Sequence, residues 1–351
     1  MRSVQKQYRP RTMRSLAVVP IDREFSALSS IVSIERLQMA QDSYHVPVLE
    51  KEIIELFTSL PAGVVVDATL GGAGHTLSLL KAAPHLRVIG IDRDPEAREE
   101  ASKKLVDFAD RVVIVDATFS NLADVINDNS AFIGTDPVVG ILMDLGVSSH
   151  QLDDASRGFS FRADAPLDMR MDPTKGPTAA EFIASIDLHE FARILRENGE
   201  NRFAGAIAKS IIERQPQTTN ELTEAVERAV PMAARRKGHV ATRVFQALRI
   251  AVNGEEAQLS LGLEAGLTVL APGGLLVVIS YHSGEDRVVK SVFAEAASGG
   301  CKCPVALGCV CGAVPTVSVF KASAQLATNE EIERNPRARS ARLRIARKVS
   351  P

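Results

Sequence analysis

Four short apolar runs in the first half of the chain each end at an aspartate. They span residues 64–66 before Asp67, 87–91 before Asp92, 111–115 before Asp116, and 138–143 before Asp144. Short runs that are rich in β-branched residues are typical of buried strands. Amphipathic stretches separate the early runs, so the pattern predicts a repeated strand–helix unit and a parallel sheet.

Helical spacing of apolar residues predicts the first helices. One is expected over 47–57, a second from Thr76 onward, and a third from Asp94-Pro95 onward. The third carries acids in its early turns, which suits the positive end of a helix.

The rhythm changes after Ser149. Residues 150–175 are charged and loop-like, and 178–252 are helical with no clear strand. The pattern then predicts a helix at 255–270, a strand at 275–280 and, from the alternation at 342–347, an edge strand.

These elements predict an α/β fold with a Rossmann-like, doubly wound, mostly parallel sheet and an inserted helical domain. A length of 351 residues is enough for a large domain and a smaller one. The predicted parts are a flexible extension at 1–41, a sheet domain formed by 42–150 and 256–351, and a helical substrate-binding domain at 151–255.

A glycine-rich loop follows the first predicted strand. Gly71, Gly72 and Gly74 come soon after Asp67, and glycine lets a ligand approach the backbone closely. Asp92 lies about 20 residues further on, where a ribose-binding acid is expected. An acid at Asp67 is unfavourable beside a pyrophosphate but favourable beside the cationic amino-acid end of S-adenosylmethionine (SAM). The alternative, that Asp67 only caps a turn, stays open.

Composition adds limits. The chain is 45% hydrophobic and 24% charged with a formal net charge of −2, as expected for a globular protein. No apolar run approaches the roughly 20 residues of a membrane helix, so we expect a cytoplasmic protein without a membrane partner. The absence of Trp disfavours a wide base-stacking platform.

Basic residues gather locally. The stretch at 235–237 reads Arg-Arg-Lys, and 334–348 is basic without an acid. Both suit phosphate contacts, and a solvated charged face is the alternative. Residues 1–41 are also basic, with no acid before Asp22. We expect a disordered tail or a start codon assigned too early; a transit peptide is the alternative.

All four cysteines lie close together, at Cys301, Cys303, Cys309 and Cys311. Four thiols at this spacing suit a structural zinc site, although paired C-x-C is not the usual knuckle. Reduced cysteines without a metal are the favoured interpretation, and disulfides are disfavoured in the cytoplasm. Nothing in the pattern indicates a catalytic role.

Several longer motifs together resemble the bacterial small-subunit rRNA cytosine-N4 methyltransferases, the RsmH or MraW family. The similarity runs in order from about residue 45 to the end of the chain. The matching segments are 45–49, 67–75, 91–95, 144–149, 151–154, 157–161, 166–173, 241–250 and 335–340.

The resemblance implies an enzyme that uses SAM to methylate the N4 amino group of a cytosine in the decoding region of 16S rRNA. Its expected partner is 16S rRNA within the small ribosomal subunit, and a homodimer stays open. The residues implied to bind SAM are Ala73, Gly74 and His75 at the methionine part, Asp92 at the ribose, Phe119 at the adenine, and Asp144 and Gln151 elsewhere in the pocket.

Methyl transfer from a sulfonium is expected to need no catalytic metal, because positioning does most of the catalysis. The Asp-Pro-Pro-aromatic loop of many amino-methyltransferases is replaced here by 144–147, Asp-Leu-Gly-Val. The candidates for the group that accepts from the amino N–H are Asp144, Asp168 and His282. The loop at 158–161 is expected either to cover the flipped base or to bury its two Phe side chains.

Two rival functions stay open at this point. A nicotinamide oxidoreductase would share the sheet, but Asp67 and the absence of G-x-G-x-x-G count against it. A ribosome-assembly factor with a vestigial pocket is disfavoured because every pocket position holds a compatible residue.

Overall fold

The computed structural model describes residues 47–232, 240–303, 310–320 and 324–349. The chain divides into two compact units, Met1–Tyr44 and His45–Pro351, and only the second contains described residues. The predicted extension at 1–41, the basic stretch at 235–237 and Cys309 lie outside the described residues.

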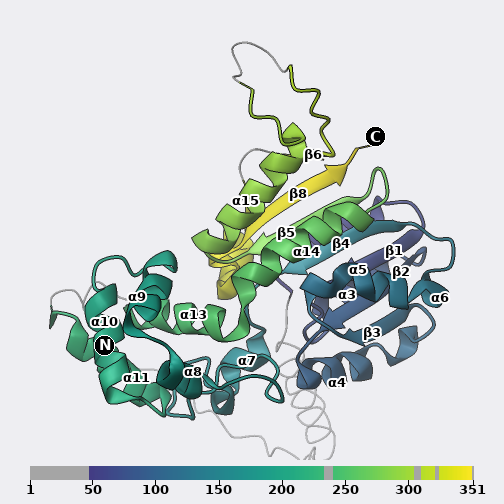
Figure 1. Ribbon diagram of the computed structural model, residues 1–351. Helices are drawn as coiled ribbons and strands as arrows, with labels where there is room; N and C mark the ends of the chain where they lie inside the picture. The colour runs from purple at the N-terminus through teal and green to yellow at the C-terminus, as the bar shows by residue number, and fades with distance from the viewer. Residues whose placement is uncertain (1–46, 233–239, 304–309, 321–323, 350–351) are drawn as a thin grey trace, which may run out of the picture. The chain divides into compact units, whose positions relative to one another are not determined.

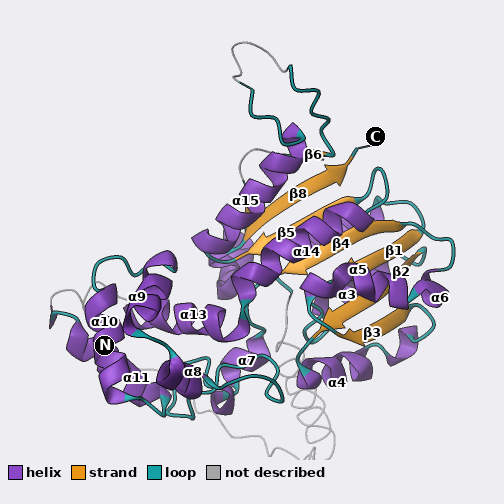
Figure 2. Cartoon of the chain, viewed as in Figure 1, coloured by secondary structure: helices purple, strands orange, loops and turns teal. Residues whose placement is uncertain are grey.

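The predicted α/β fold with a mostly parallel sheet is confirmed (Figure 2). The strand order is β3-β2-β1-β4-β5-β8-β6, with β7 paired to β8. Strands β3, β2, β1, β4 and β5 are parallel, and β8 runs antiparallel to β5. The strands are β1 (Gly63–Asp67), β2 (Leu86–Asp92), β3 (Val112–Asp116), β4 (Val138–Asp144), β5 (Leu275–Ser280), β6 (Val317–Val319), β7 (Gln325–Leu326) and β8 (Arg342–Lys348).

Helices pack on both faces of the sheet, which explains why β1, β4 and β5 read as continuous apolar runs. On one face Val65 packs with α2 (Glu50–Thr58), α3 (Gly74–Ala82) and α4 (Pro95–Lys104). On the other face Val64 and Val66 pack with a second set of helices. That set is α5 (Leu122–Asp128), α6 (Ser130–Ile133), α14 (Glu255–Val269) and α15 (Ser283–Ser298). Figure 1 shows one of these helices, α14, lying along the sheet.

The region between β4 and α14 is helical and has its own hydrophobic core. Phe191, Ile207 and Leu248 are among its fully buried residues. Its elements are α7 (Ser149–Asp153), the 3-10 helix η4 (Ala155–Arg157), α8 (Ala179–Ser185), α9 (Leu188–Glu197), α10 (Ala204–Arg214), α11 (Thr219–Ala229) and α13 (Val240–Asn253). The exact boundaries predicted for an inserted domain, 151 and 255, stay a prediction.

The prediction of an edge strand at 342–347 is wrong. Strand β8 lies inside the sheet, with β5 on one side and β6 and β7 on the other. Its polar positions tolerate this because Arg342 and Arg344 both pair with Asp286 of α15. The alternation of polar and apolar residues therefore correctly marks a strand, but it does not show whether that strand lies at the edge or inside the sheet.

The remaining elements are short. They are the 3-10 helices η2 (Val106–Phe108), η3 (Phe119–Asn121) and η6 (Pro336–Ser340), and the helix α16 (Asn329–Arg334). Within the described ranges, no helix is long and apolar enough to span a membrane.

Candidate functional site

The sheet contains a point where the direction of the strand order reverses. The chain runs from β1 outward to β2 and β3, and then returns to place β4 on the other side of β1. In open α/β sheets, ligands bind outside the carboxyl ends of the strands at such a point. A cavity of about 560 Å³ lies here, lined by the segments that follow β1 to β5, by the helical region and by η6.

The glycine loop after β1 forms one wall of this cavity. Gly74 and His75, both predicted to bind the cofactor, are among the lining residues. Ala73 is not: its side chain is fully buried in the sheet core, and its backbone is left-handed with a φ of 61°. The Ala73 side chain therefore does not face the cavity. Its left-handed backbone instead shapes the start of α3.

Asp67 also lies outside the lining of the cavity. Its carboxylate accepts hydrogen bonds from the Thr76 hydroxyl at 2.7 Å and from the Thr69 backbone N–H at 3.3 Å. Burial raises the pKa of Asp67, although these hydrogen bonds oppose the shift. The structure thus agrees with the alternative interpretation, in which Asp67 fixes the turn and the start of α3.

Asp92 lines the cavity at the end of β2. The Gly71 N–H donates to its Oδ2 at 2.7 Å, and the Asp94 N–H donates to its Oδ1 at 2.8 Å. Burial raises the pKa of Asp92 to about 6, against the opposing effect of these two bonds. Each oxygen still has a lone pair for a ligand hydroxyl, because a carboxylate has about four acceptor positions.

Phe119 reaches the cavity from the segment that follows β3. Gly262 of α14 makes room for it, because a Cβ at that position would lie 2.7 Å from Cδ2 of the Phe119 ring. The sequence could not reveal this pairing, since the two residues are close only in the fold.

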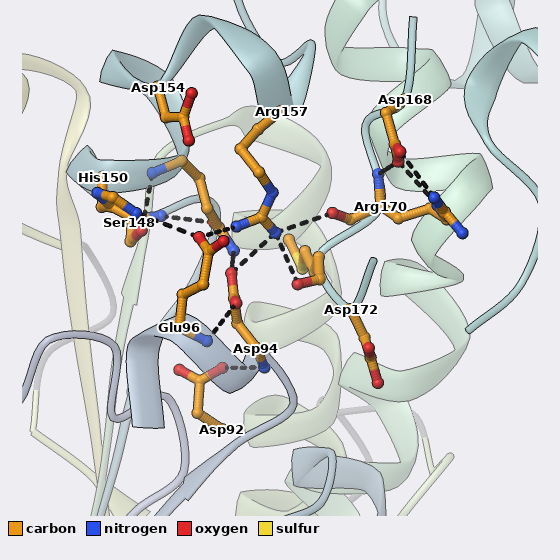
Figure 3. Close-up of polar contacts among 12 residues, drawn as sticks. Asp92, Asp94, Glu96, Ser148, His150, Asp154, Arg157, Asp168, Arg170 and Asp172 are labelled. Atoms are coloured by element: carbon orange, nitrogen blue, oxygen red, sulfur yellow. Dashed lines mark hydrogen bonds and ion pairs between the residues drawn. The ribbon is translucent and has the colours of Figure 1, made fainter. Parts of the chain in front are cut away.

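A buried polar network next to Asp92 joins the sheet to the helical region (Figure 3). Asp94 is 1% exposed, and its Oδ2 accepts from Gln151 Nε2 at 2.7 Å and from Arg157 Nη2 at 2.9 Å. The Arg157 guanidinium also donates to Glu96 and to the backbone oxygens of Arg170 and Met171. Gln151 lines the cavity, but its amide is already used by Asp94 and by the Ser148 N–H.

The end of β4 places another carboxylate, that of Asp144, at the wall of the cavity. The Tyr281 hydroxyl donates to Asp144 Oδ1 at 2.7 Å, and His75 Nε2 lies 3.5 Å from Asp144 Oδ2. Neither ring nitrogen of His75 makes a directed hydrogen bond within the described residues, so this contact is electrostatic. Burial alone would lower the pKa of His75, but the long hydrogen-bonding contact with Asp144 and the charges of Asp144, Asp67 and Glu50 raise it overall. The Asp144 side chain is 25% exposed and therefore open to a ligand.

The other two catalytic candidates are placed differently. Asp168 is outside the lining of the cavity, and Arg170 holds both of its oxygens, at 2.8 and 2.7 Å. His282 lines the cavity but caps α15, since its Nδ1 accepts from the N–H groups of Gly284 and Glu285. The structure thus brings Asp144 and His282 to one cavity and leaves Asp168 elsewhere.

The two Phe residues of the loop at 158–161 do not line the cavity. Phe159 is buried in the core of the helical region. Phe161 is exposed and packs edge-on against Phe245, with ring centroids 5.3 Å apart. Burial of Phe159 follows the second of the two expectations for this loop.

Comparison with known proteins identifies the family. The pattern that defines the MraW methylase family matches residues 42–349. The chain is 47% identical over 313 residues to a protein named ribosomal RNA small subunit methyltransferase H from Heliobacterium modesticaldum, which covers 87% of this chain and 99% of that protein. A protein of the same name from Geobacter sulfurreducens is 47% identical over 312 residues, again covering 87% and 99%.

The chain belongs to the MraW methylase family. The resemblance seen in the motifs is thereby confirmed, and so is the expectation of a methyltransferase. Among solved structures, a SAM-dependent O-methyltransferase from Thermotoga maritima aligns with 86% of this chain and 65% of its own, at 9% identity and a TM-score of 0.36.

Two residues of this MraW-family site escaped the sequence analysis. Tyr281, which holds Asp144, was visible only as the residue next to His282, and Arg157 only as part of a motif. Tyr281 comes directly after a strand and Arg157 directly before a glycine, and neither position is a strong sign of a functional residue. A hydrogen-bond partner 137 residues away cannot be read from local pattern.

We expect His282→Ala to destabilise the fold by about 1 kcal/mol, because it removes an N-cap. Asn is among the best N-cap residues, so His282→Asn should restore the loss. Urea unfolding measures both variants. If His282→Asn were as stable as the parent protein and yet inactive in methyl transfer, the capping role would be insufficient and a catalytic role would follow.

Proposed function

We propose that this chain transfers the methyl group of SAM to the N4 amino group of a cytosine in 16S rRNA within the small ribosomal subunit. The observation that carries the proposal is one cavity whose acidic lining includes Asp92, at the end of β2, and Asp144, at the end of β4. Relatives named ribosomal RNA small subunit methyltransferase H support the substrate class. The motifs that resemble cytosine-N4 methyltransferases support the choice of atom.

The cavity fits SAM. Its volume of about 560 Å³ lies within the range typical of small-molecule sites. Asp92 would accept from the ribose hydroxyls, Phe119 would pack on the adenine, and Gly74 and His75 would lie at the methionine part. When bound, SAM supplies a methyl group on a positively charged sulfur.

Asp144 is the proposed acceptor for the amino group. The N4 lone pair of cytosine is delocalised into the ring, so attack requires an acceptor that polarises an N–H bond and tolerates the departing proton. The Tyr281 hydroxyl donates to one Asp144 oxygen. This bond fixes the Asp144 side chain and leaves its remaining lone pairs free to accept from the amino group. Asp168 is a weaker candidate: burial alone would raise its pKa, but its bonds to Arg170 lower it overall.

Exposed cations at the cavity wall suit a polyanionic substrate. Arg287, Arg337 and Arg339 line the cavity and are exposed. Arg337 is held by Asp153 at 2.9 Å, whereas Arg287 and Arg339 make no ion pair within the described ranges. Arg287 and Arg339 could therefore contact phosphates without giving up an ion pair within the protein.

The chemistry proposed here needs no catalytic metal, because every step uses a side chain named above. The oligomeric state does not enter the proposal, since these residues all belong to one chain. We also propose a cytoplasmic location, because ribosomal subunits, the proposed substrate, are found there.

Binding of SAM should weaken in acid. If the ribose requires the Asp92 carboxylate, whose pKa is about 6, affinity should be constant above pH 7 and about tenfold lower at pH 5. Calorimetry from pH 5 to 8 measures this. Asp92→Asn should bind weakly with little dependence on pH. The same slope in Asp92→Asn would assign the pH dependence to another group.

The proposed substrate is tested by labelling. The protein is incubated with methyl-labelled SAM and either small subunits or free 16S rRNA that lack the modification, and labelled nucleosides are then identified. The expected product is N4-methylcytidine, formed on the subunit. A label on carbon 5 of cytosine or on another base would overturn the proposed atom, and tight subunit binding without label would favour an assembly factor.

A further inference from the structure

The loop between α15 and β6 brings three cysteine sulfurs together. The Sγ atoms of Cys301, Cys303 and Cys311 all lie within 4.8 Å of one another. Zn–S bonds of about 2.3 Å in a tetrahedral site place sulfur atoms about 3.8 Å apart. The three thiols are therefore close to the arrangement of a zinc ligand set before the metal contracts it.

Hydrophobic burial does not explain what holds the described residues of this loop, 301–303 and 310–316, in place. The Thr316 N–H donates to the Ala296 oxygen at 2.9 Å, which closes the base of the loop. Between Cys301 and Thr316, none of the described residues is buried, and Val310 and Val314 are 89% and 65% exposed. Ordering a segment costs about 1–2 kcal/mol per residue in backbone entropy. Another interaction must offset that cost here.

The backbone is arranged to stabilise charge on one of the sulfurs. The N–H groups of Val310 and Cys311 donate hydrogen bonds to the Cys303 sulfur, as do the thiols of Cys311 and Cys301. The thiolate is the form that binds metals. Hydrogen bonds to a ligand atom also orient it toward the metal.

We propose that Cys301, Cys303 and Cys311 bind one structural Zn²⁺ ion. Each thiol loses its proton as its Zn–S bond forms, so binding releases protons and involves no oxidation. Thiolates favour soft or borderline metals, and three thiolates with one further ligand complete the tetrahedral set that zinc prefers. Cys309 lies outside the described residues, and the proposal does not depend on it.

The zinc site lies far from the cofactor cavity along α15. His282 and Gly284 line the cavity at the start of this 16-residue helix, and Cys301 follows its end. A helix of this length spans about 24 Å. The metal should therefore order the loop and leave the cavity unchanged, so that its test is independent of the proposed methyl transfer.

The test is metal analysis of the full chain purified under reducing conditions. We expect one zinc per chain, and replacement by Co²⁺ should give the intense visible absorption and the thiolate charge-transfer band of a tetrahedral sulfur site. Cys303→Ser should weaken zinc binding by more than tenfold and speed tryptic cleavage after Lys302. Ser298→Ala, next to the loop, is the matched control and should keep both the zinc and the protection.

Several results would overturn the proposal. They are a reduced protein without zinc, a weak octahedral cobalt spectrum, the spectrum of an iron–sulfur cluster, or equal zinc affinity in the parent protein and Cys303→Ser. A far-UV circular dichroism spectrum identical to that of the parent protein shows that Cys303→Ser has folded, so that loss of zinc reports on the site itself.

Discussion

Asp144→Asn should lower the rate of methyl transfer from bound SAM by about 10²–10³-fold. Asn keeps the shape of Asp but carries no charge, and one of its two polar atoms is a donor. Tyr281 already donates to one oxygen of Asp144. In the variant, the cytosine amino group would therefore meet either the Asn NH₂, which cannot accept a hydrogen bond, or the Asn oxygen, which already accepts from Tyr281. Single-turnover kinetics at saturating SAM measure the effect on chemistry alone.

Asp168→Asn is the control for this prediction. Asp168 was an equal candidate by sequence, but Arg170 holds it outside the cavity. We expect Asp168→Asn to retain the rate of the parent protein, with some loss of stability from the weakened ion pair. A large loss of rate in Asp168→Asn together with a normal rate in Asp144→Asn would reverse the assignment.

Arg157→Met should destabilise the protein by about 3–5 kcal/mol, because it leaves a buried carboxylate without its partner. Arg157 is 6% exposed, and Asp94, which it contacts, is 1% exposed. The change also strips hydrogen bonds from the backbone oxygens of Arg170 and Met171. SAM affinity should fall as well, since the Asp94 N–H supports Asp92. Urea unfolding and calorimetry measure the two effects.

Two further variants test the cause of that loss. Arg193 forms ion pairs with Glu190 and Glu197 on the surface, where its side chain is 53% exposed, so Arg193→Met should cost far less stability than Arg157→Met. Asp94→Asn added to Arg157→Met should recover part of the stability, because Asn removes the buried charge and still caps α4. Equal losses in the single and the double variant would show that the buried charge is not the reason.

The strands and the position of the cavity were predictable because both depend on local pattern. Runs buried on both faces of a sheet must be continuously apolar, and the first polar residue after each run marks the carboxyl edge. This rule marks Asp67, Asp92, Asp116 and Asp144 alike, and only Asp92 and Asp144 line the cavity. The family motifs then attached roles to them, which periodicity could not have done.

What local pattern could not predict depended on contacts between distant segments. Asp67 and Ala73 stand in the glycine-loop motif, yet the fold turns one toward Thr76 and buries the other in the core. His282 has the right residue type beside the cavity, but it is already the cap of α15. Strand β8 was placed at an edge because no local signal reveals that β6 and β7 cover it.

The measurement that tests the account most directly compares SAM binding with methyl transfer in three proteins: the parent protein, Asp92→Ala and Asp144→Asn. Calorimetry gives the affinity, and single-turnover labelling of small subunits gives the rate. The cavity assignment predicts that Asp92→Ala loses binding, whereas Asp144→Asn binds SAM and transfers its methyl group slowly. Unchanged binding in Asp92→Ala, or an unchanged rate in Asp144→Asn, would contradict it.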